Sequence, residues 1–195
     1  MLRRCEEREP FQWSCHLQHK PGADLEHKEW LHTKTTDPRR EFCTSLLGCL
    51  GEVGSVVVYS HFERTTLEAM SELFPDLSDQ LQAIITRLWD LCACVRVGFY
   101  HPGFQGSFSI KTVLPKLVPT MSYEGMAIAD GMAAVEAWDE LVKFNAAEHI
   151  EESVRPEILE PAKEQRRRSL LDYCSMDSLA MVRVVDALKI LNSTL

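Results

Sequence analysis

Two carboxylates occupy positions where a helix normally carries apolar side chains. Glu63 is followed at helical spacing by three apolar residues, Leu67, Met70 and Phe74. At 100° per residue the three apolar side chains point within about 40° of the direction of Glu63. Asp177 lies in the same way among the apolar residues of a long helical pattern near the C-terminus. A carboxylate on an apolar face is costly unless it is paired, protonated or bound to a metal ion, so both residues are candidates for chemistry.

Tyr173 adds a third group, because it lies one helical turn before Asp177 on the same face. Polar residues collect on the opposite face of this helix: Asp172, Ser175, Arg183 and Asp186. Asp177 stands in the middle of the helix, so capping does not explain it. A buried salt bridge, for example to Lys111, and a metal ligand both stay open for Asp177.

Each of the other candidates has a structural explanation beside a functional one. Ser60 and Glu63 have the spacing of a capping box, which stabilises many helices without any chemistry. Asp90 lies off the apolar stripe of a predicted helix and is most simply a solvated residue. His61 and His101 are expected to be loop hydrogen-bonding groups, since neither has a second His or Cys at ligand spacing. The run 166–168 is read as a solvated basic face, with phosphate contact as the alternative.

Composition limits the classes of protein to which the chain can belong. Its 195 residues suit one domain with a sizeable core, and 45% hydrophobic with 26% charged residues is ordinary for a soluble globular chain. No segment approaches the roughly 18 apolar residues of a membrane span. Seven cysteines without a CxxC pair indicate reduced thiols and a cytoplasmic location. The net charge of -8 argues against a broadly basic nucleic-acid surface, but not against a local site that holds cations.

The elements that must position these residues follow from apolar periodicity and from turn signals. The central stretch, residues 55–74, is predicted to be a buried strand, a tight turn and a helix. Two antiparallel strands and several further helices complete the prediction: strands 11–18 and 24–31, and helices 38–50, 78–95, 109–117, 131–144 and 169–191. Residues 145–168 are expected to form a mobile connection or a marginal helix, and residues 1–9 a disordered or truncated N-terminus.

Seven motifs together resemble a bacterial family of uncharacterised domains that is often found C-terminal to RecB-like nuclease modules. The resemblance covers about residues 10–188. The motifs that carry it are PFQWSCH (10–16), TDPRREF (36–42), VVVYSHFE (56–63), RLWDL (87–91), GSFSIKTVLPKLVP (106–119), SYEGMAIADGMAA (122–134) and LLDYCSMDSLAMV (170–182). That family in turn looks like the ribonuclease H-like, DnaQ-type 3′–5′ exonucleases, which place four acidic residues on two divalent metal ions.

The resemblance implies a role for each candidate residue. Glu63 and Asp177 would bind Mg²⁺ or Mn²⁺, Asp90 would be a further metal ligand, and Tyr173 would orient the attacking water. Lys111 would contact a phosphate or a carboxylate. The resemblance places His61 and Ser109 beside Lys111 as substrate-binding candidates. Two metal ions in such a site activate water and stabilise the leaving oxygen of a phosphodiester.

The sequence departs from the family pattern at one point, and this departure changes the expected fold. The family begins with a strand that carries an Asp-x-Glu pair upstream of the PFQ motif, and this sequence shows no such pair there. We therefore expect residues 10–195 to form a ribonuclease H-like α/β domain, with a mixed sheet flanked by helices, that lacks its first strand.

Two functions follow from this expectation. The first is a metal-dependent 3′–5′ exonuclease-like phosphodiesterase, an N-terminally truncated copy with impaired activity that acts on nucleic acid and associates with, or is fused to, a RecB-like nuclease module. The alternative is a non-catalytic module that retains the fold and binds nucleic acid or protein. The choice between DNA and RNA and the oligomeric state stay open.

Overall fold

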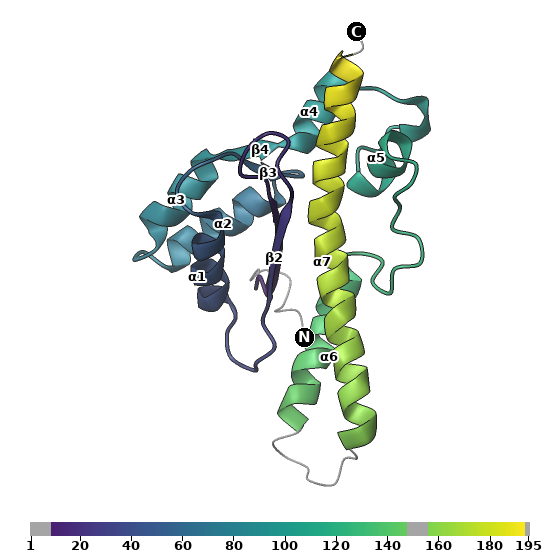
Figure 1. Ribbon diagram of the computed structural model, residues 1–195. Coiled ribbons are helices and arrows are strands. Elements are labelled where there is room, and N and C mark those ends of the chain that lie inside the picture. The colour runs from purple at the N-terminus through teal and green to yellow at the C-terminus, as the bar shows by residue number, and fades with distance from the viewer. Residues whose placement is uncertain (1–8, 148–155, 194–195) are drawn as a thin grey trace. The chain divides into compact units, whose positions relative to one another are not determined.

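The computed structural model describes residues 9–147 and 156–193, and Figure 1 shows their helices and strands. The described residues form a mixed α/β structure with small sheets. The strands are β1 (Gln12–Leu17), β2 (Glu26–Leu31), β3 (Val56–Val58) and β4 (Leu88–Asp90). The helices are α1 (Arg39–Leu50), α2 (Phe62–Leu73), α3 (Ser78–Thr86), α4 (Leu91–Gly98), the short 3₁₀ helix η1 (Pro102–Phe104), α5 (Ile110–Leu117), α6 (Gly131–Ala147) and α7 (Pro156–Ser193).

The chain divides into two compact units. Unit 1 comprises residues 1–42 and 124–176, and unit 2 comprises residues 43–123 and 177–195. Two of the three boundaries fall inside helices, so α1 and α7 each contribute residues to both units, and the third lies between α5 and α6.

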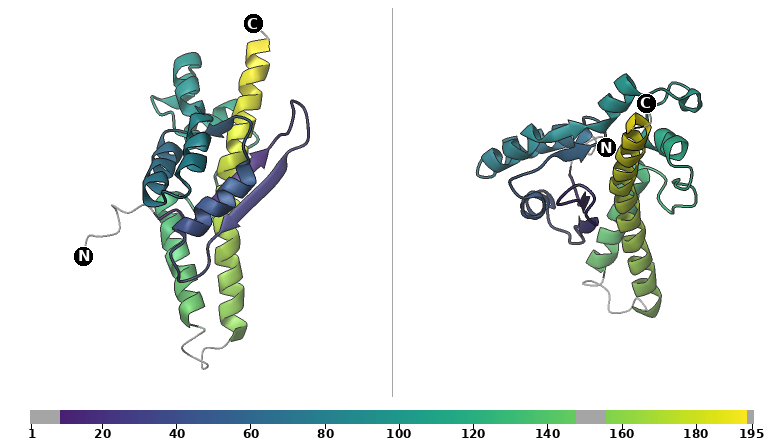
Figure 2. Two further views of the ribbon diagram at one scale, coloured as in Figure 1. Left: turned by 90° about the vertical axis from the view of Figure 1, so that its left-hand side faces the viewer. Right: turned by 45° about the horizontal axis from the view of Figure 1, so that its top comes forward.

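Unit 1 contains an antiparallel hairpin, and α6 contacts the residues at its ends. β1 and β2 pair with Trp13 opposite Trp30. Phe11 stacks on Trp138 of α6 with ring centroids 4.6 Å apart, and the Trp138 indole N–H donates a hydrogen bond to the His32 carbonyl oxygen at 2.8 Å. α6 runs beside the first part of α7 (Figures 1 and 2). The hairpin therefore gains the helical support that a two-stranded sheet needs in water.

Unit 2 is built on two parallel strands, each followed by a helix. β3 and β4 pair with Val56 opposite Leu88 and Val58 opposite Asp90. α2 follows β3 and α4 follows β4, so both helices begin at the carboxyl ends of the strands. Ligands of parallel α/β sheets bind at this edge. The buried apolar side chains of unit 2 include residues of these helices and of α3, α5 and α7: Leu67, Met70, Leu81, Ile84, Leu91, Val95, Val113, Leu114 and Val184.

The arrangement of the strands differs from the single mixed sheet that we expected. Within the described residues they form two separate two-stranded sheets, β1–β2 antiparallel and β3–β4 parallel. Both pairings are consistent with an α/β class. The periodicity of a strand predicts which of its faces is buried, but not its partner, because partners are set by contacts between distant parts of the chain.

The stretch 78–95 forms three elements instead of the one predicted helix. α3 ends at Thr86, β4 follows, and α4 begins at Leu91. The apolar residues keep a helical period throughout, but the backbone N–H and C=O groups of β3 require partners, and the residues of β4 supply them. Asp90 then starts α4 as its N-cap, where its side chain accepts a hydrogen bond from the Ala93 N–H.

The last helix is longer than predicted. Of the stretch 145–168, residues 145–147 extend α6 and residues 156–168 begin α7, while residues 148–155 lie outside the described residues. In this polar part of α7, the Arg168 Nε donates to Glu164 Oε1 at 2.7 Å, one turn earlier. Such pairs stabilise an exposed helix without any apolar stripe, so apolar periodicity does not predict it. The expected disordered or truncated N-terminus lies outside the described residues, apart from Glu9.

The remaining predicted elements are confirmed with small changes at their ends. The strands 11–18 and 24–31 appear as β1 and β2, and α1 begins after Asp37, whose Oδ1 accepts from the Arg39 N–H at 2.9 Å. The short predicted helix 109–117 is α5, with Pro115 inside it, and the helix 131–144 is α6, which extends to Ala147.

Two expectations from composition can be compared with these elements. No helix in the described part of the chain is both long and apolar enough to cross a lipid bilayer. Six cysteines in the described part of the chain form no disulfide bond: Cys15, Cys43, Cys49, Cys92, Cys94 and Cys174.

We predict that S60G stabilises the protein. Ser60 follows β3 with a φ of +93°, a conformation that L-residues other than glycine disfavour. Glycine should raise the free energy of unfolding by about 1 kcal/mol in denaturant titrations. S109G is the matched control: Ser109 has a φ of −59°, so glycine there adds only freedom in the unfolded chain and should cost about 0.5–1 kcal/mol. A lower stability of S60G would mean that the Ser60 hydroxyl, which accepts from the Phe62 N–H at 3.4 Å, outweighs the strain.

Candidate functional site

The turn between β3 and α2 places Glu63 on the inner face of unit 2. α2 begins at Phe62 with His61 as its N-cap, and His61 makes no capping hydrogen bond through its side chain. The predicted capping box of Ser60 and Glu63 is therefore wrong, and Glu63 loses its simplest structural explanation. The apolar stripe is confirmed, because Leu67 and Met70 of the same face are buried.

Glu63 is held in an unfavourable environment for a charged group. Its Oε2 atom is buried and has no hydrogen-bond partner among the described residues. Burial raises the pKa of Glu63 to about 7, and the nearby negative charges of Asp90 and Asp177 act in the same direction. The backbone N–H of Glu63 itself opposes this rise. Glu63 is thus poised to bind a proton or a cation near neutral pH.

Asp90 makes hydrogen bonds to both strand-to-helix turns of unit 2, the one after β3 and the one after β4. It ends β4 and caps α4, and its Oδ1 accepts hydrogen bonds from the Ala93 N–H at 3.1 Å and from the Ser60 N–H at 3.2 Å. The prediction of a solvated helical residue is wrong, because Asp90 is half-buried at the end of a strand. Its carboxylate lies close enough to Glu63 for the two charges to interact.

Asp177 is the third carboxylate, and it accepts a hydrogen bond from a tyrosine hydroxyl. Asp177 is half-buried on α7, where its Oδ1 accepts a hydrogen bond from the Tyr123 hydroxyl at 2.8 Å. The ammonium group of Lys111 lies 5.4 Å from the centroid of the Tyr123 ring. Sequence reasoning placed Tyr123 inside the SYEGMAIADGMAA motif but gave it no role. Tyr123 follows no periodic pattern, so only the motif itself pointed to it.

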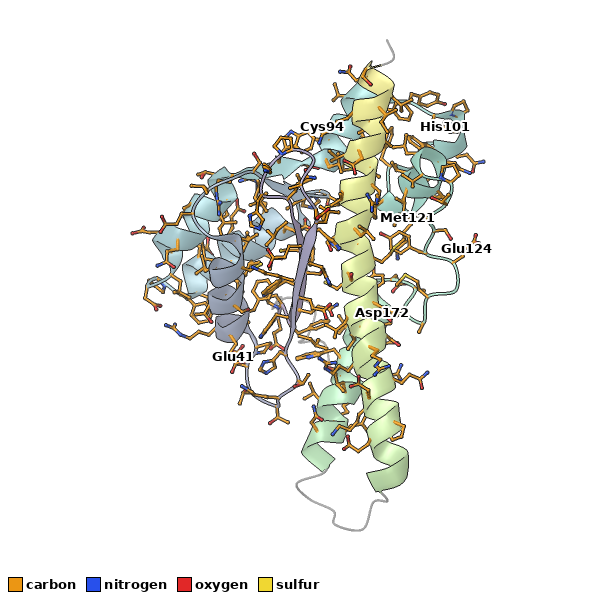
Figure 3. The ribbon with its side chains drawn as sticks, in the orientation of Figure 1. Glu41, Cys94, His101, Met121, Glu124 and Asp172 are labelled. Atoms are coloured by element: carbon orange, nitrogen blue, oxygen red, sulfur yellow. The ribbon has the colours of Figure 1, made fainter. Side chains whose placement is uncertain are left out.

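The structure brings together some of the predicted site residues and not others. Glu63, Asp90 and Asp177 gather in unit 2. His61 and Ser109 are exposed in the same unit. Tyr173 is buried on α7, but it belongs to unit 1. Asp172, one residue before it, is exposed, as the helical pattern predicts (Figure 3).

The residues with predicted structural roles agree in part with those roles. His101 is a loop hydrogen-bonding group, as predicted: its Nδ1 accepts from the Gly103 N–H at 3.0 Å. Arg166 of the basic run pairs with Glu140 instead of standing only as a solvated cation.

The carboxylates of Glu63, Asp90 and Asp177 are chemically suited to bind a hard divalent cation, but their positions are not. Carboxylate oxygens are the ligands that Mg²⁺ and Mn²⁺ prefer, and the buried Oε2 of Glu63 lacks a partner among the described residues. However, no group of three or more His, Cys, Asp and Glu side chains in the described part of the chain is placed to hold a metal ion. Cation binding would therefore require the three carboxylates to move closer together.

We predict that E63Q removes a pH-dependent loss of stability. Glu63 has a pKa of about 7 in the folded chain against an ordinary value of 4.5, so its protonated form favours folding. That contribution is complete below about pH 4.5 and is lost as the pH rises through 7. In chelator, the unfolding free energy of the wild type should fall by up to about 3 kcal/mol relative to E63Q between pH 4.5 and 8. E72Q, at an exposed position of α2, should follow the wild type, and equal pH profiles for E63Q and the wild type would contradict the assignment.

Comparison with known proteins places the chain in a family without assigning an activity. No curated protein and no solved structure matches it. A family model described as a domain of unknown function, DUF2779, matches residues 7–109, more than half of the chain. The match includes Glu63 and Asp90 and ends before Tyr123 and Asp177. The chain belongs to the DUF2779 family.

Proposed function

We propose that this protein is a divalent-metal-dependent phosphodiesterase-type domain, related to the ribonuclease H-like 3′–5′ exonucleases. One observation carries the proposal: Glu63 follows β3 and Asp90 ends β4 at the carboxyl ends of two parallel strands, the charge of Asp177 on α7 acts on Glu63, and Glu63 has a buried oxygen without a partner in the described residues. The charges of Asp90 and Asp177 disfavour the ionised form of Glu63, so the mutual repulsion itself does not stabilise the fold. Clusters of like charge are typical of functional sites, where a bound ligand can neutralise the charge.

The proposed cation is Mg²⁺ or Mn²⁺, held by Glu63, Asp90 and Asp177. Glu63 would contribute its unpartnered oxygen. Asp90 and Asp177 would each contribute a carboxylate oxygen. When bound, the metal ions supply activation of water and stabilisation of the leaving oxygen. The resemblance implies four carboxylates, and the described residues bring three together, so we expect impaired activity.

The chain's own residues would prepare the site before any cation binds. The two backbone N–H groups on Asp90 Oδ1 hold its carboxylate at the junction of the two turns. Tyr173 lies one turn before Asp177 on the same helix, which separates the two residues by about 6 Å along the axis. Its proposed role in orienting water, and those of Lys111, His61 and Ser109 toward substrate, rest on the resemblance. The association with a RecB-like nuclease module also stays a prediction.

A non-catalytic binding module is the second candidate, and a specific observation favours it. One oxygen of Asp90 and one of Asp177 already accept hydrogen bonds, and the described residues hold no group placed for a metal ion. A domain that has lost catalysis would keep these contacts, because they stabilise its fold. It would show no affinity for a divalent cation.

Thermal unfolding with and without Mn²⁺ distinguishes the two candidates. We predict that Mn²⁺ at about 100 times its dissociation constant stabilises the wild type by roughly 2.7 kcal/mol. D177N and E63Q should lose most of this stabilisation, whereas D172N, at an exposed position of α7, should keep it. No stabilisation of the wild type would favour the binding module. Stabilisation that D177N retains would remove Asp177 from the ligand set.

Cleavage of end-labelled single strands tests the enzymatic part of the proposal. We predict that the wild type shortens DNA or RNA oligonucleotides from the 3′ end in Mn²⁺ and not in excess chelator. D177N should lower the rate by at least about 100-fold, since it removes a charge that stabilises the transition state through the metal. A rate that is equal in D177N and the wild type would indicate a contaminating nuclease.

A further inference from the structure

His32 is a buried histidine of unit 1, at the point where β2 passes into the connection to α1. Its side chain is 1% exposed. The His32 N–H donates to the Phe11 carbonyl oxygen at 2.8 Å, and the His32 carbonyl oxygen accepts from the Trp138 indole N–H at 2.8 Å. The Trp30 ring lies beside the imidazole, with centroids 5.9 Å apart. The backbone of His32 therefore connects the end of β2 with the residue before β1 and with α6.

The neighbours of the imidazole ring determine which of its nitrogens carries a hydrogen. Nε2 lies 2.8 Å from the Thr36 carbonyl oxygen, and a carbonyl oxygen can only accept a hydrogen bond. Nε2 must therefore carry the hydrogen, which leaves Nδ1 bare in the neutral ring. Nδ1 is buried and makes no hydrogen bond within the described residues, although it lies 3.4 Å from Glu41 Oε2. The neutral ring thus turns a lone pair toward a carboxylate oxygen.

Two carboxylates act on the His32 ring, and each is also paired with a cation. The Lys34 ammonium lies 2.9 Å from Glu41 Oε1, and the Arg39 guanidinium lies 2.6 Å from Asp37 Oδ2. These cations lower the pKa of Glu41 and of Asp37 most, and a charge on His32 acts in the same direction. Both carboxylates therefore stay ionised over the pH range in which histidine side chains change charge.

Burial and the nearby carboxylates have opposite effects on the charge of His32. Desolvation disfavours the charged form of a buried histidine. The neutral form is also unfavourable here, because a buried polar atom without a partner costs free energy and Nδ1 is such an atom. A proton on Nδ1 would replace this repulsive contact with a charge-assisted hydrogen bond to Glu41. The Glu41 side chain is 47% exposed, so it has room to move the few tenths of an ångström that this bond requires.

We propose that His32 and Glu41 form a pH-sensitive latch on the connection between β2 and α1. The latch closes when Nδ1 takes up a proton from solvent, and it loosens when Nδ1 releases that proton. Figure 3 shows Glu41 at the end of α1 where this connection enters the helix. Closing ties the first turn of α1 to the residue at which the hairpin meets α6. The proposal uses none of the carboxylates of the candidate site, so it does not depend on the proposed function.

The direction of the pH effect follows from the two states of the chain. In the unfolded chain Glu41 is not held beside His32, so the carboxylate favours the proton only in the folded chain. The latch therefore adds stability at pH values below the histidine range, and this contribution is lost as the pH rises through that range.

The first test observes the proton on His32 by ¹⁵N NMR of the imidazole nitrogens. The sequence contains seven histidines, and His→Gln variants at the other positions assign the His32 signals. At pH 8.5 these signals should show a hydrogen on Nε2 and a bare Nδ1, and acid should add a hydrogen to Nδ1. E41Q should require a pH lower by about one unit for the same degree of protonation. E52Q, at an exposed position just after α1, should behave like the wild type.

Two results of this test would overturn the latch. The first is a hydrogen on Nδ1 at pH 8.5, because the neutral ring would then already donate to Glu41. The second is equal protonation of His32 in E41Q and in the wild type at every pH.

Thermal unfolding at two pH values tests whether the pair stabilises the fold. E41Q should lower the Tm by about 3 °C at pH 5.5 and by less than about 1 °C at pH 8.5. The pair of Glu41 with Lys34 keeps its charges at both values, so the difference between the two losses reports on His32. Glu63 is present in both proteins, so its titration cancels in the comparison. An equal loss at both pH values would mean that Glu41 acts through other partners, and the latch would be wrong.

Hydrogen exchange at the Trp138 indole N–H measures whether the proton moves the connection. This N–H donates to the His32 carbonyl oxygen, so its protection depends on how firmly His32 is held. After correction for the intrinsic exchange rate, protection between pH 6 and pH 8 should fall several-fold more in the wild type than in E41Q. If His32 loses its proton and Trp138 stays equally protected relative to E41Q, the titration does not loosen the connection and the latch is overturned.

Discussion

The carboxylate of Asp90 holds together the part of unit 2 on which the candidate site depends. Its Oδ1 accepts one hydrogen bond from the turn after β3 and another from the start of α4 after β4. The two strands are only three residues long, so their ladder alone supplies few bonds. Charge-assisted hydrogen bonds are stronger than neutral ones. The bond to the Ser60 N–H therefore helps to hold the positive φ of Ser60, and with it the direction in which α2 leaves the sheet.

The three carboxylates of the candidate site have different partners. Asp90 is satisfied by backbone N–H groups, and Asp177 accepts from the hydroxyl of Tyr123. Glu63 is on the buried side of α2, and its Oε2 has no partner among the described residues. Burial and the charges of the other two carboxylates concentrate the electrostatic cost on Glu63. A proton or a cation that enters this cluster therefore gains most at Glu63.

The residues matched by the family model include only part of the candidate site. Residues 7–109 contain both strand-to-helix turns of unit 2, with Glu63 and Asp90. Asp177, Lys111 and Tyr123 lie beyond the match, on α7, on α5 and in the segment that follows α5. The cluster is complete only when these later segments fold onto the first part of unit 2. Its function is therefore a property of the folded unit and not of the matched segment alone.

The sequence by itself determined most of the helices, the antiparallel hairpin and the inward direction of Glu63 and Asp177, because helical and strand periods depend on neighbouring residues. It did not reveal β4, since the residues from Leu88 to Asp90 continue a helical pattern and become a strand only by pairing with β3. Nor did it predict that Asp90 caps α4 and binds the Ser60 N–H, and it gave Tyr123 no role. Asp90 acts through the Ser60 N–H and Tyr123 through the Asp177 carboxylate, 30 and 54 positions away in the chain. Only the tertiary structure decided these contacts, because a hydrogen bond between distant residues leaves no periodic trace in the sequence.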